Sequence, residues 1–195
     1  MSEQDNAGTK PEIDLDELVA SSDKGGRNPT GGVGRLLTVV AICWSLYQLW
    51  IASPLPYMVA DIIPIPNNLH TRPTHFSFAL FLAFMAYPAF KSSPKDRVPI
   101  YDWIFGLVGA ACVVYLAIFS SQLADRPGLP ATADLTVSAI GLVCLLEATR
   151  RALGPPLMVV ALVFASYIFF GEHAPDIIAW QGASFNKAMS HLWIT

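Results

Sequence analysis

The chain has 195 residues, of which 53% are hydrophobic and only 14% are charged, and its mean hydropathy is +0.46. Soluble globular domains carry about 25% charged residues, so this composition argues against a soluble globule and for a membrane protein. The net charge of −3, with no basic run interleaved with aromatic residues, excludes nucleic-acid binding as an expected function.

The first segment of the chain, residues 1–34, is polar and holds seven acidic and three basic side chains. Such a segment cannot bury enough apolar surface to offset the entropy lost on ordering, so we expect a disordered, acidic cytoplasmic tail over 1–34. Its acidic start is not that of a cleaved signal peptide. A short surface helix or docking strip is the other interpretation for the apolar side chains of Ile13, Leu15, Leu18 and Val19.

The remainder of the chain consists of long apolar runs. A helix needs roughly 20 apolar residues to span a hydrocarbon core of about 30 Å, and a helix satisfies its own backbone in lipid. The runs therefore predict an all-α, polytopic transmembrane protein with about five spans. The predicted spans are 36–53, 73–90, 104–124, 135–150 and 152–171, the first four forming a four-helix small membrane domain over 35–151.

The fourth span is the weakest of the five, because only residues 135–146 are free of charge and twelve helical residues rise about 18 Å. It must take Asp134 or Glu147 into the membrane boundary, or else fail to cross. The sequence at 150–156 ends one helix and starts another, which favours crossing. A re-entrant segment is the alternative, and it would reverse the side of everything that follows.

Basic residues near the ends of the spans predict the orientation. With the N-terminus in the cytoplasm, nine of the twelve basic residues fall on the inside and three on the outside, so we expect a cytoplasmic N-terminus. The inside set is Lys10, Lys24, Arg27, Arg35, Lys91, Lys95, Arg97, Arg150 and Arg151, and the outside set is Arg72, Arg126 and Lys187.

Two acidic positions near span ends are candidates for a structural or functional role. Glu147 precedes Arg150 and Arg151 by three and four residues, which places all three on one helical face. A carboxylate at the membrane boundary needs such partners, so an interface salt-bridge cluster is favoured over a switch or a substrate site. Asp102 falls in the first turn of the third helix, where we expect helix capping.

His70, Arg72 and His75 cluster at the start of the second span, on the predicted outer surface. They could contact an anion or a partner protein, and contact with lipid headgroups is the simpler interpretation. No carboxylate stands at ligand spacing, so the cluster does not indicate a metal site. No metal-binding residue is assigned.

The sequence also lacks the motifs that carry chemistry. No nucleophile and base pair, glycine-rich phosphate loop or zinc-protease motif is present, so neither an enzyme nor a bound cofactor is expected. No charge falls near the centre of a span, and no two broken helices are paired, although these are the usual signs of a transport pathway. The helices are therefore predicted to be scaffold.

Four strings in the sequence, taken together, match one family. They are Thr71-Arg-Pro-Thr-His75 leading to Tyr87-Pro88, Val98-Pro-Ile-Tyr-Asp-Trp103, Leu146-Glu-Ala-Thr-Arg-Arg-Ala-Leu-Gly154, and 175–184 running on to 190–195. In order and spacing, residues 35–195 resemble the N-terminal, small-subunit-like region of the fused permeases of tripartite ATP-independent periplasmic (TRAP) transporters, the TAXI-associated subclass.

The resemblance implies a role in uptake across the bacterial inner membrane. In that family a periplasmic binding protein delivers an organic acid or amino acid, which enters with sodium, and a large transport domain holds the sodium and substrate sites. Residues 152–195 would then be a connecting transmembrane helix and the run-in to that transport domain, fused downstream or separate. The expected partners are this domain, the lipid bilayer and the binding protein, for which Arg72 and His75 are the candidate outer contact.

Two other functions stay open on the sequence. One is a membrane-anchored interaction or regulatory module that recruits a partner through its acidic tail. The more distant one is a membrane enzyme that handles a quinone through His70 and His75.

Overall fold

The computed structural model describes residues 26–62, 67–90 and 92–194, and this part of the chain is helical, with no strand. The all-α prediction is thereby confirmed. The long helices are α2 (Gly31–Ala52), α4 (Asn68–Ala86), α5 (Ile100–Ile118), α7 (Thr132–Ala152) and α8 (Pro155–Phe170). The short ones are α3 (Leu55–Met58), α6 (Ser120–Ala124), α9 (Phe185–Met189), the 3₁₀ helix η1 (Gly171–His173) and the π-helix η2 (Ser190–Ile194).

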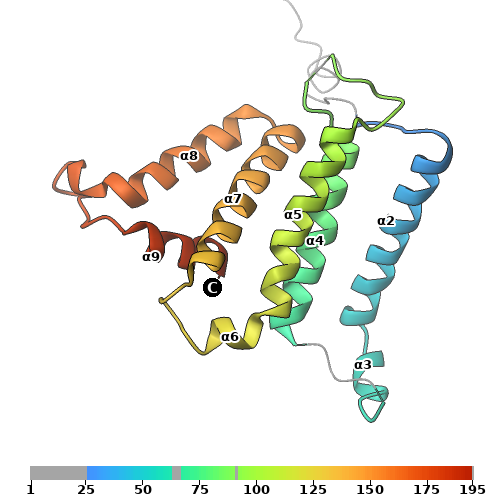
Figure 1. Cartoon of the computed structure of the whole chain (residues 1–195), viewed down its shortest axis with the longest axis horizontal. Helices are drawn as coiled ribbons and strands as arrows, with labels where there is room; N and C mark the ends of the chain where they lie inside the picture. The colour runs from blue at the N-terminus through green and yellow to red at the C-terminus, as the bar shows by residue number, and fades with distance from the viewer. Residues whose placement is uncertain (1–25, 63–66, 91, 195) are drawn as a thin grey trace, which may run out of the picture.

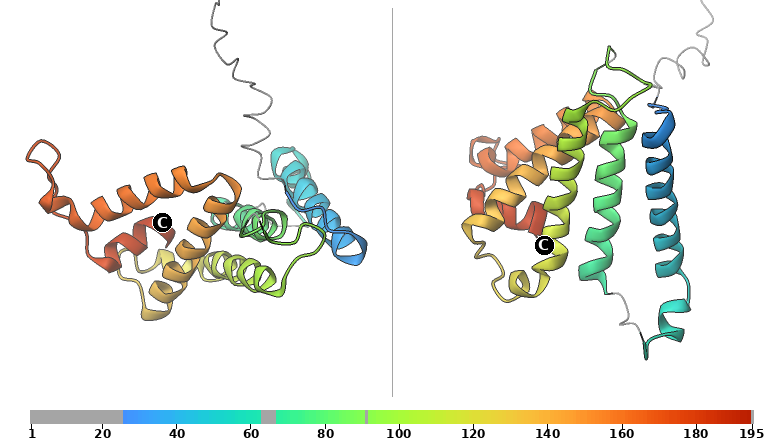
Figure 2. Two further views of the ribbon diagram at one scale, coloured as in Figure 1. Left: turned by 90° about the horizontal axis from the view of Figure 1, so that it is seen from above. Right: turned by 45° about the vertical axis from the view of Figure 1, so that its right-hand side comes forward.

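Helices α4 and α5 lie side by side in the middle of the molecule, with α2 packed against α4 and α7 packed against α5 (Figures 1 and 2). Helix α8 turns back from the end of α7 and leans away from the bundle, and η2 returns to contact α7. We call the end that holds residues 26–30, the loop between α4 and α5 and the end of α7 the Arg27 end. The opposite end, with the starts of α4 and α7 and with α6, is the Asp134 end.

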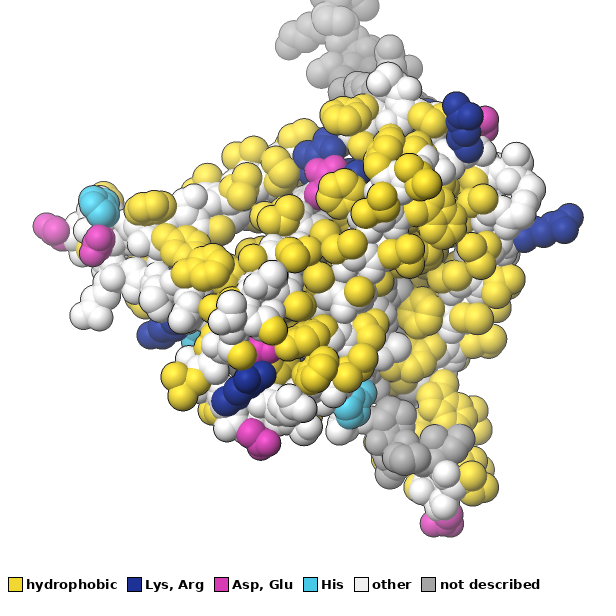
Figure 3. All heavy atoms as spheres, viewed as in Figure 1, with side chains coloured by type: hydrophobic (Ala, Val, Ile, Leu, Met, Phe, Trp, Pro, Cys, Tyr) yellow, Lys and Arg dark blue, Asp and Glu magenta, His cyan; other side chains and the backbone are white. Residues whose placement is uncertain are grey.

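The core lies between α4, α5 and α7. Phe84, Met85 and Val113 are fully buried there, and Trp193 joins them from the C-terminal segment. Helices α2 and α8, in contrast, have no buried residue and expose their apolar side chains. On the face shown in Figure 3, hydrophobic side chains cover the middle of the molecule and charged side chains lie toward its periphery. Such a distribution suits helices that face lipid.

Four of the described helices are long and apolar enough to cross a membrane, judged by length and composition. They are α2, α5, α7 and the segment Pro155–His173. The 21 residues of α7 rise about 31 Å, so the weak fourth span has the length that crossing needs. Helix α4 is the fifth long helix and is less apolar, because its first two turns carry His70, Arg72 and His75.

Several boundaries differ from those expected. Helix α2 begins at Gly31, and Arg27 just before it is buried, so residues 26–34 are not part of a disordered tail; residues 1–25 lie outside the described residues. The span expected at 104–124 starts earlier, after Pro99, and breaks at Phe119, where α5 gives way to α6. Helix α8 starts at Pro155 because Gly154, with φ of 92°, ends the preceding turn and proline suits a first helical position.

Candidate functional site

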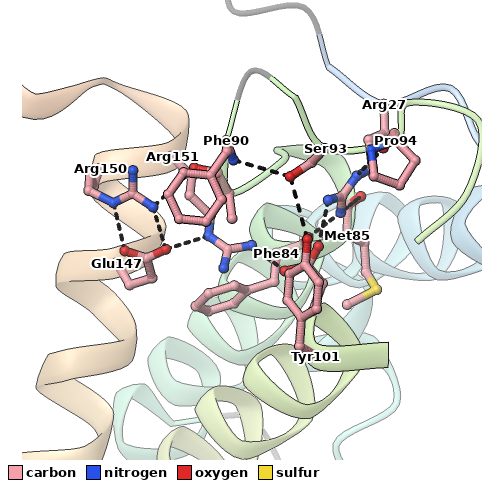
Figure 4. Close-up of polar contacts among 12 residues, drawn as sticks. Arg27, Phe84, Met85, Phe90, Ser93, Pro94, Tyr101, Glu147, Arg150 and Arg151 are labelled. Atoms are coloured by element: carbon pink, nitrogen blue, oxygen red, sulfur yellow. Dashed lines mark hydrogen bonds and ion pairs between the residues drawn. The ribbon is translucent and has the colours of Figure 1, made fainter. Parts of the chain in front are cut away.

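Five charged residues meet at the Arg27 end of the bundle, and we call them the arginine cluster: Arg27, Asp102, Glu147, Arg150 and Arg151. Figure 4 labels all of them except Asp102. The five residues come from the segment before α2, the first turn of α5 and the last turns of α7. The cluster therefore joins parts of the chain that are far apart in sequence.

Asp102 is the centre of the arginine cluster and is fully buried. Its Oδ1 accepts a hydrogen bond from Arg151 Nη1 at 2.5 Å, and its Oδ2 lies 2.5 Å from Arg27 Nη2. The sequence predicted a helix cap, but no side chain caps the first turn of α5. The carboxylate instead pairs with two guanidinium groups, one at each of its oxygens, through charge-assisted contacts.

Arg27 fastens the segment before α2 to the bundle. Its side chain is fully buried, and its Nε donates to the carbonyl of Pro94 at 3.2 Å while Nη1 donates to the carbonyl of Phe84 at 3.2 Å. The backbone N–H of Arg27 also donates to the carbonyl of Ala86 at 2.7 Å. The guanidinium thus donates hydrogen bonds to carbonyl groups in the last turn of α4 and also forms an ion pair with Asp102.

The structure brings Glu147, Arg150 and Arg151 together, as their spacing on one helical face predicts. Glu147 accepts two hydrogen bonds of 2.7 Å from Arg150 and one of 2.8 Å from Arg151. Arg150 also donates to the carbonyl of Ala89 at 3.1 Å, in the loop after α4. Through Arg151, this local group continues into the Asp102 pair.

Aromatic rings cover the arginine cluster. The Cζ atom of Arg151 lies 4.8 Å from the centre of the Phe84 ring, which stacks on Phe105 at 5.7 Å, and Arg150 lies 5.7 Å from the Phe90 ring. Cation–π contacts of this kind add to the attraction of the ion pairs. The cluster is therefore built to hold segments together rather than to receive a ligand.

The two residues proposed for an outer contact lie at the Asp134 end but do not share a contact. Arg72 is exposed and makes no ion pair with any described residue. His75 contacts α2, where its Nδ1 lies 3.1 Å from Trp44 Nε1 and also meets the side-chain amide of Gln48. His75 therefore holds α2 against α4, whereas Arg72 is available to another molecule.

A second polar group surrounds Asp134 at the other end of the bundle. The buried carboxylate accepts hydrogen bonds from the Tyr115 hydroxyl at 2.6 Å and from the backbone N–H of Ala131 at 2.8 Å. Arg126 forms an ion pair with it at 3.0 Å. Sequence analysis identified Asp134 only as a residue near the membrane boundary and missed these partners, since Tyr115 comes from a different helix.

A cavity of about 570 Å³ lies beside Asp134, between the start of α4, α6 and the start of α7. Its walls include the apolar side chains of Phe76 and Leu116, and its polar lining includes Arg72, Arg126 and Asp134. The volume is in the range of small-molecule sites.

Trp193 closes one side of this cavity and was missed by the sequence analysis. The indole is buried, its ring centre lies 5.8 Å from that of Phe76, and it packs on Gly141 of α7. A Cβ at Gly141 would lie 2.1 Å from Trp193 Cζ2, so the glycine makes room for the ring. The segment expected to run on toward a transport domain thus packs against the bundle at this point.

Comparison with known proteins found no relative of this chain. No protein-family model matches the chain, and no curated protein or solved structure matches it. A functional proposal therefore rests on the residues and contacts described above.

Proposed function

We propose that this chain is the membrane scaffold of a TRAP-type, sodium-driven, periplasmic-binding-protein-dependent transporter for organic acids or amino acids. The observation that carries the proposal is the arginine cluster, which fastens α4, α5, α7 and the segment before α2 at one end of the bundle. A support against which a transport domain moves must itself resist movement, and a buried network of ion pairs gives that rigidity.

The distribution of buried charge supports a scaffold over a pathway. Among the described residues, the buried charged side chains lie near the two ends of the bundle, with Arg27, Asp102 and Arg151 at one end and Asp134 at the other. The core between them is apolar. Ion and substrate pathways in membranes carry polar or charged groups at depth, so sodium and substrate would pass through the partner domain.

The placement of basic residues supports a cytoplasmic N-terminus in the bacterial inner membrane. The Arg27 end holds Arg27, Arg35, Lys95, Arg97, Arg150 and Arg151, and the opposite end holds Arg72 and Arg126. The positive-inside rule then assigns the Arg27 end to the cytoplasm and the Asp134 end to the periplasm.

Changing Arg72 to alanine is expected to raise the concentration of binding protein that gives half-maximal uptake, because Arg72 is exposed and unpaired toward the periplasm. Changing His75 to alanine should act differently, since His75 contacts α2 and its loss should loosen that helix. Uptake measured against binding-protein concentration in cells carrying the complete transporter checks both. Equal uptake curves for Arg72→Ala and the unmodified protein would remove Arg72 from the proposed contact.

Deleting residues 2–25 separates the scaffold proposal from recruitment of a partner through the acidic tail. The scaffold proposal predicts near-normal uptake, because Arg27 and its contacts are kept. Recruitment predicts loss of uptake. A deletion of residues 2–30 serves as the contrasting variant: it removes Arg27, leaves Asp102 with Arg151 alone, and should reduce the amount of folded protein in the membrane.

A further inference from the structure

We propose that the cavity at the Asp134 end binds the anionic head group, a carboxylate or a phosphate, of an amphiphile. The cavity lies between the start of α4, α6, the start of α7 and η2. This inference does not rest on the transport role, since it follows from the donors that line the cavity.

Three hydrogen-bond donors at the cavity have no acceptor among the described residues. Trp193 is 8% exposed, and its buried Nε1 has no hydrogen-bond partner. The Nε of Arg126 is likewise buried without a partner. Arg72 adds an exposed guanidinium that makes no ion pair with the described residues. Buried donors are almost always satisfied, so this arrangement indicates an acceptor that comes from a ligand.

The charge balance of the lining indicates an anion. Asp134 directs its carboxylate to Tyr115, Arg126 and the backbone of Ala131, so its oxygens are already occupied by protein donors. With two arginines and one aspartate, the lining carries one net positive charge. Arginine binds carboxylate and phosphate oxygens through paired hydrogen bonds, so a monoanion matches both charge and geometry.

The rest of the lining is largely apolar, which favours a ligand with an apolar body. Phe76, Val113, Leu116 and Leu123 form much of the wall, and the volume of about 570 Å³ accommodates more than a small inorganic ion. The ligand class is therefore an acid head group attached to a hydrocarbon chain. A free organic carboxylate and an anionic lipid both supply this chemistry.

Quenching of tryptophan fluorescence by bromine-labelled probes tests the proposal on the full chain in a neutral detergent. The probe is 11-bromoundecanoate, with 11-bromoundecanol as its uncharged counterpart. We expect the carboxylate to bind at least about tenfold more tightly than the alcohol, because a charge-assisted hydrogen bond to arginine is worth that ratio or more. Trp193→Phe should remove most of the quenching by the carboxylate.

A matched pair of arginine variants tests whether the carboxylate binds in the cavity. Arg72→Gln should weaken binding of the carboxylate by about tenfold and leave binding of the alcohol unchanged. Arg97→Gln is the control, because Arg97 is an exposed arginine at the opposite end of the bundle, and it should change neither. Both positions are exposed, so both variants should fold.

Competition by short-chain lipids distinguishes the two sources of the ligand. Displacement of the probe by dihexanoyl-phosphatidylglycerol, but not by dihexanoyl-phosphatidylcholine, would identify an anionic lipid head group. Retention of the probe against both lipids, with selective binding of the carboxylate, would identify a free organic acid. Equal binding of 11-bromoundecanoate and 11-bromoundecanol, or equal effects of Arg72→Gln and Arg97→Gln, would overturn the proposal.

Discussion

Replacing Asp102 with alanine is expected to lower the free energy of unfolding by about 3–5 kcal/mol. The change leaves the buried guanidinium of Arg27 without its ion-pair partner, and leaves Arg151 with Glu147 alone. A buried charge without a partner has a large desolvation cost that the protein cannot recover. Equilibrium unfolding in mixed micelles, with SDS as denaturant, measures the loss.

Two further variants separate the effect of charge from the effect of position. Asp96 is an exposed aspartate in the loop between α4 and α5, so Asp96→Ala should stay within about 0.5 kcal/mol of the unmodified protein. Combining Arg27→Met, Asp102→Leu and Arg151→Met should recover much of the loss, because an apolar group can replace a whole buried ion network but not one member of it. Equal stability of Asp102→Ala and Asp96→Ala would contradict the arrangement described.

Replacing Trp193 with alanine is expected to cost about 3–5 kcal/mol, because it deletes a buried indole from the core and leaves a void beside Phe76 and Gly141. The C-terminal segment should also detach from α7, so limited proteolysis should cut after α8 sooner than in the unmodified protein. The same unfolding titration and a protease time course measure both effects.

A double-mutant cycle with Gly141 shows whether the indole sits on that glycine. Gly141→Ala should destabilise the protein, since the new methyl group meets Trp193 at 2.1 Å. With Trp193→Ala the same change should become stabilising by about 1 kcal/mol, because alanine favours helix over glycine. Gly32→Ala in α2, where a Cβ meets nothing within 4 Å, is the control. A Gly141 effect that is the same in both backgrounds would contradict the packing.

The helices could be predicted from the sequence because each apolar run is a local property of the chain. The runs placed α2, α5, α7 and α8 within a few residues of their observed positions. The ends were less accurate where contacts decide them. Residues 26–30 are polar, so the sequence predicted that they belong to the tail, yet Arg27 is buried because its guanidinium pairs with the carboxylate of Asp102, 75 positions further along the chain.

Of the arginine cluster, only the contacts within α7 could be predicted from the sequence. Glu147, Arg150 and Arg151 meet because three and four positions along a helix share a face. The pairing of Asp102 with Arg27 and Arg151 depends on how α5, α7 and the segment before α2 pack together, and no spacing in the sequence encodes it. For Asp102, its local position in the first turn of a helix favoured capping over an ion site.

The cavity could not be predicted for the same reason. Its lining joins Arg72 at the start of α4, Arg126 after α6 and Trp193 in η2, which are distant in sequence. One local signal was available: Gly141 lies on a face of α7 made of small residues, together with Ser138, Cys144 and Ala148, and such a face lets another element approach the helix closely. The identity of that element follows only from the fold.

The most direct test of the scaffold proposal is the mass and composition of the native polypeptide, purified from its own membranes with an antibody to residues 1–25. The proposal predicts that the chain occurs either within a polypeptide several-fold larger than 21.2 kDa or in a stable complex with a large membrane subunit. In either form, the purified material should support sodium-gradient-driven uptake when it is reconstituted with its binding protein. A species of 21.2 kDa that purifies alone would contradict the proposal.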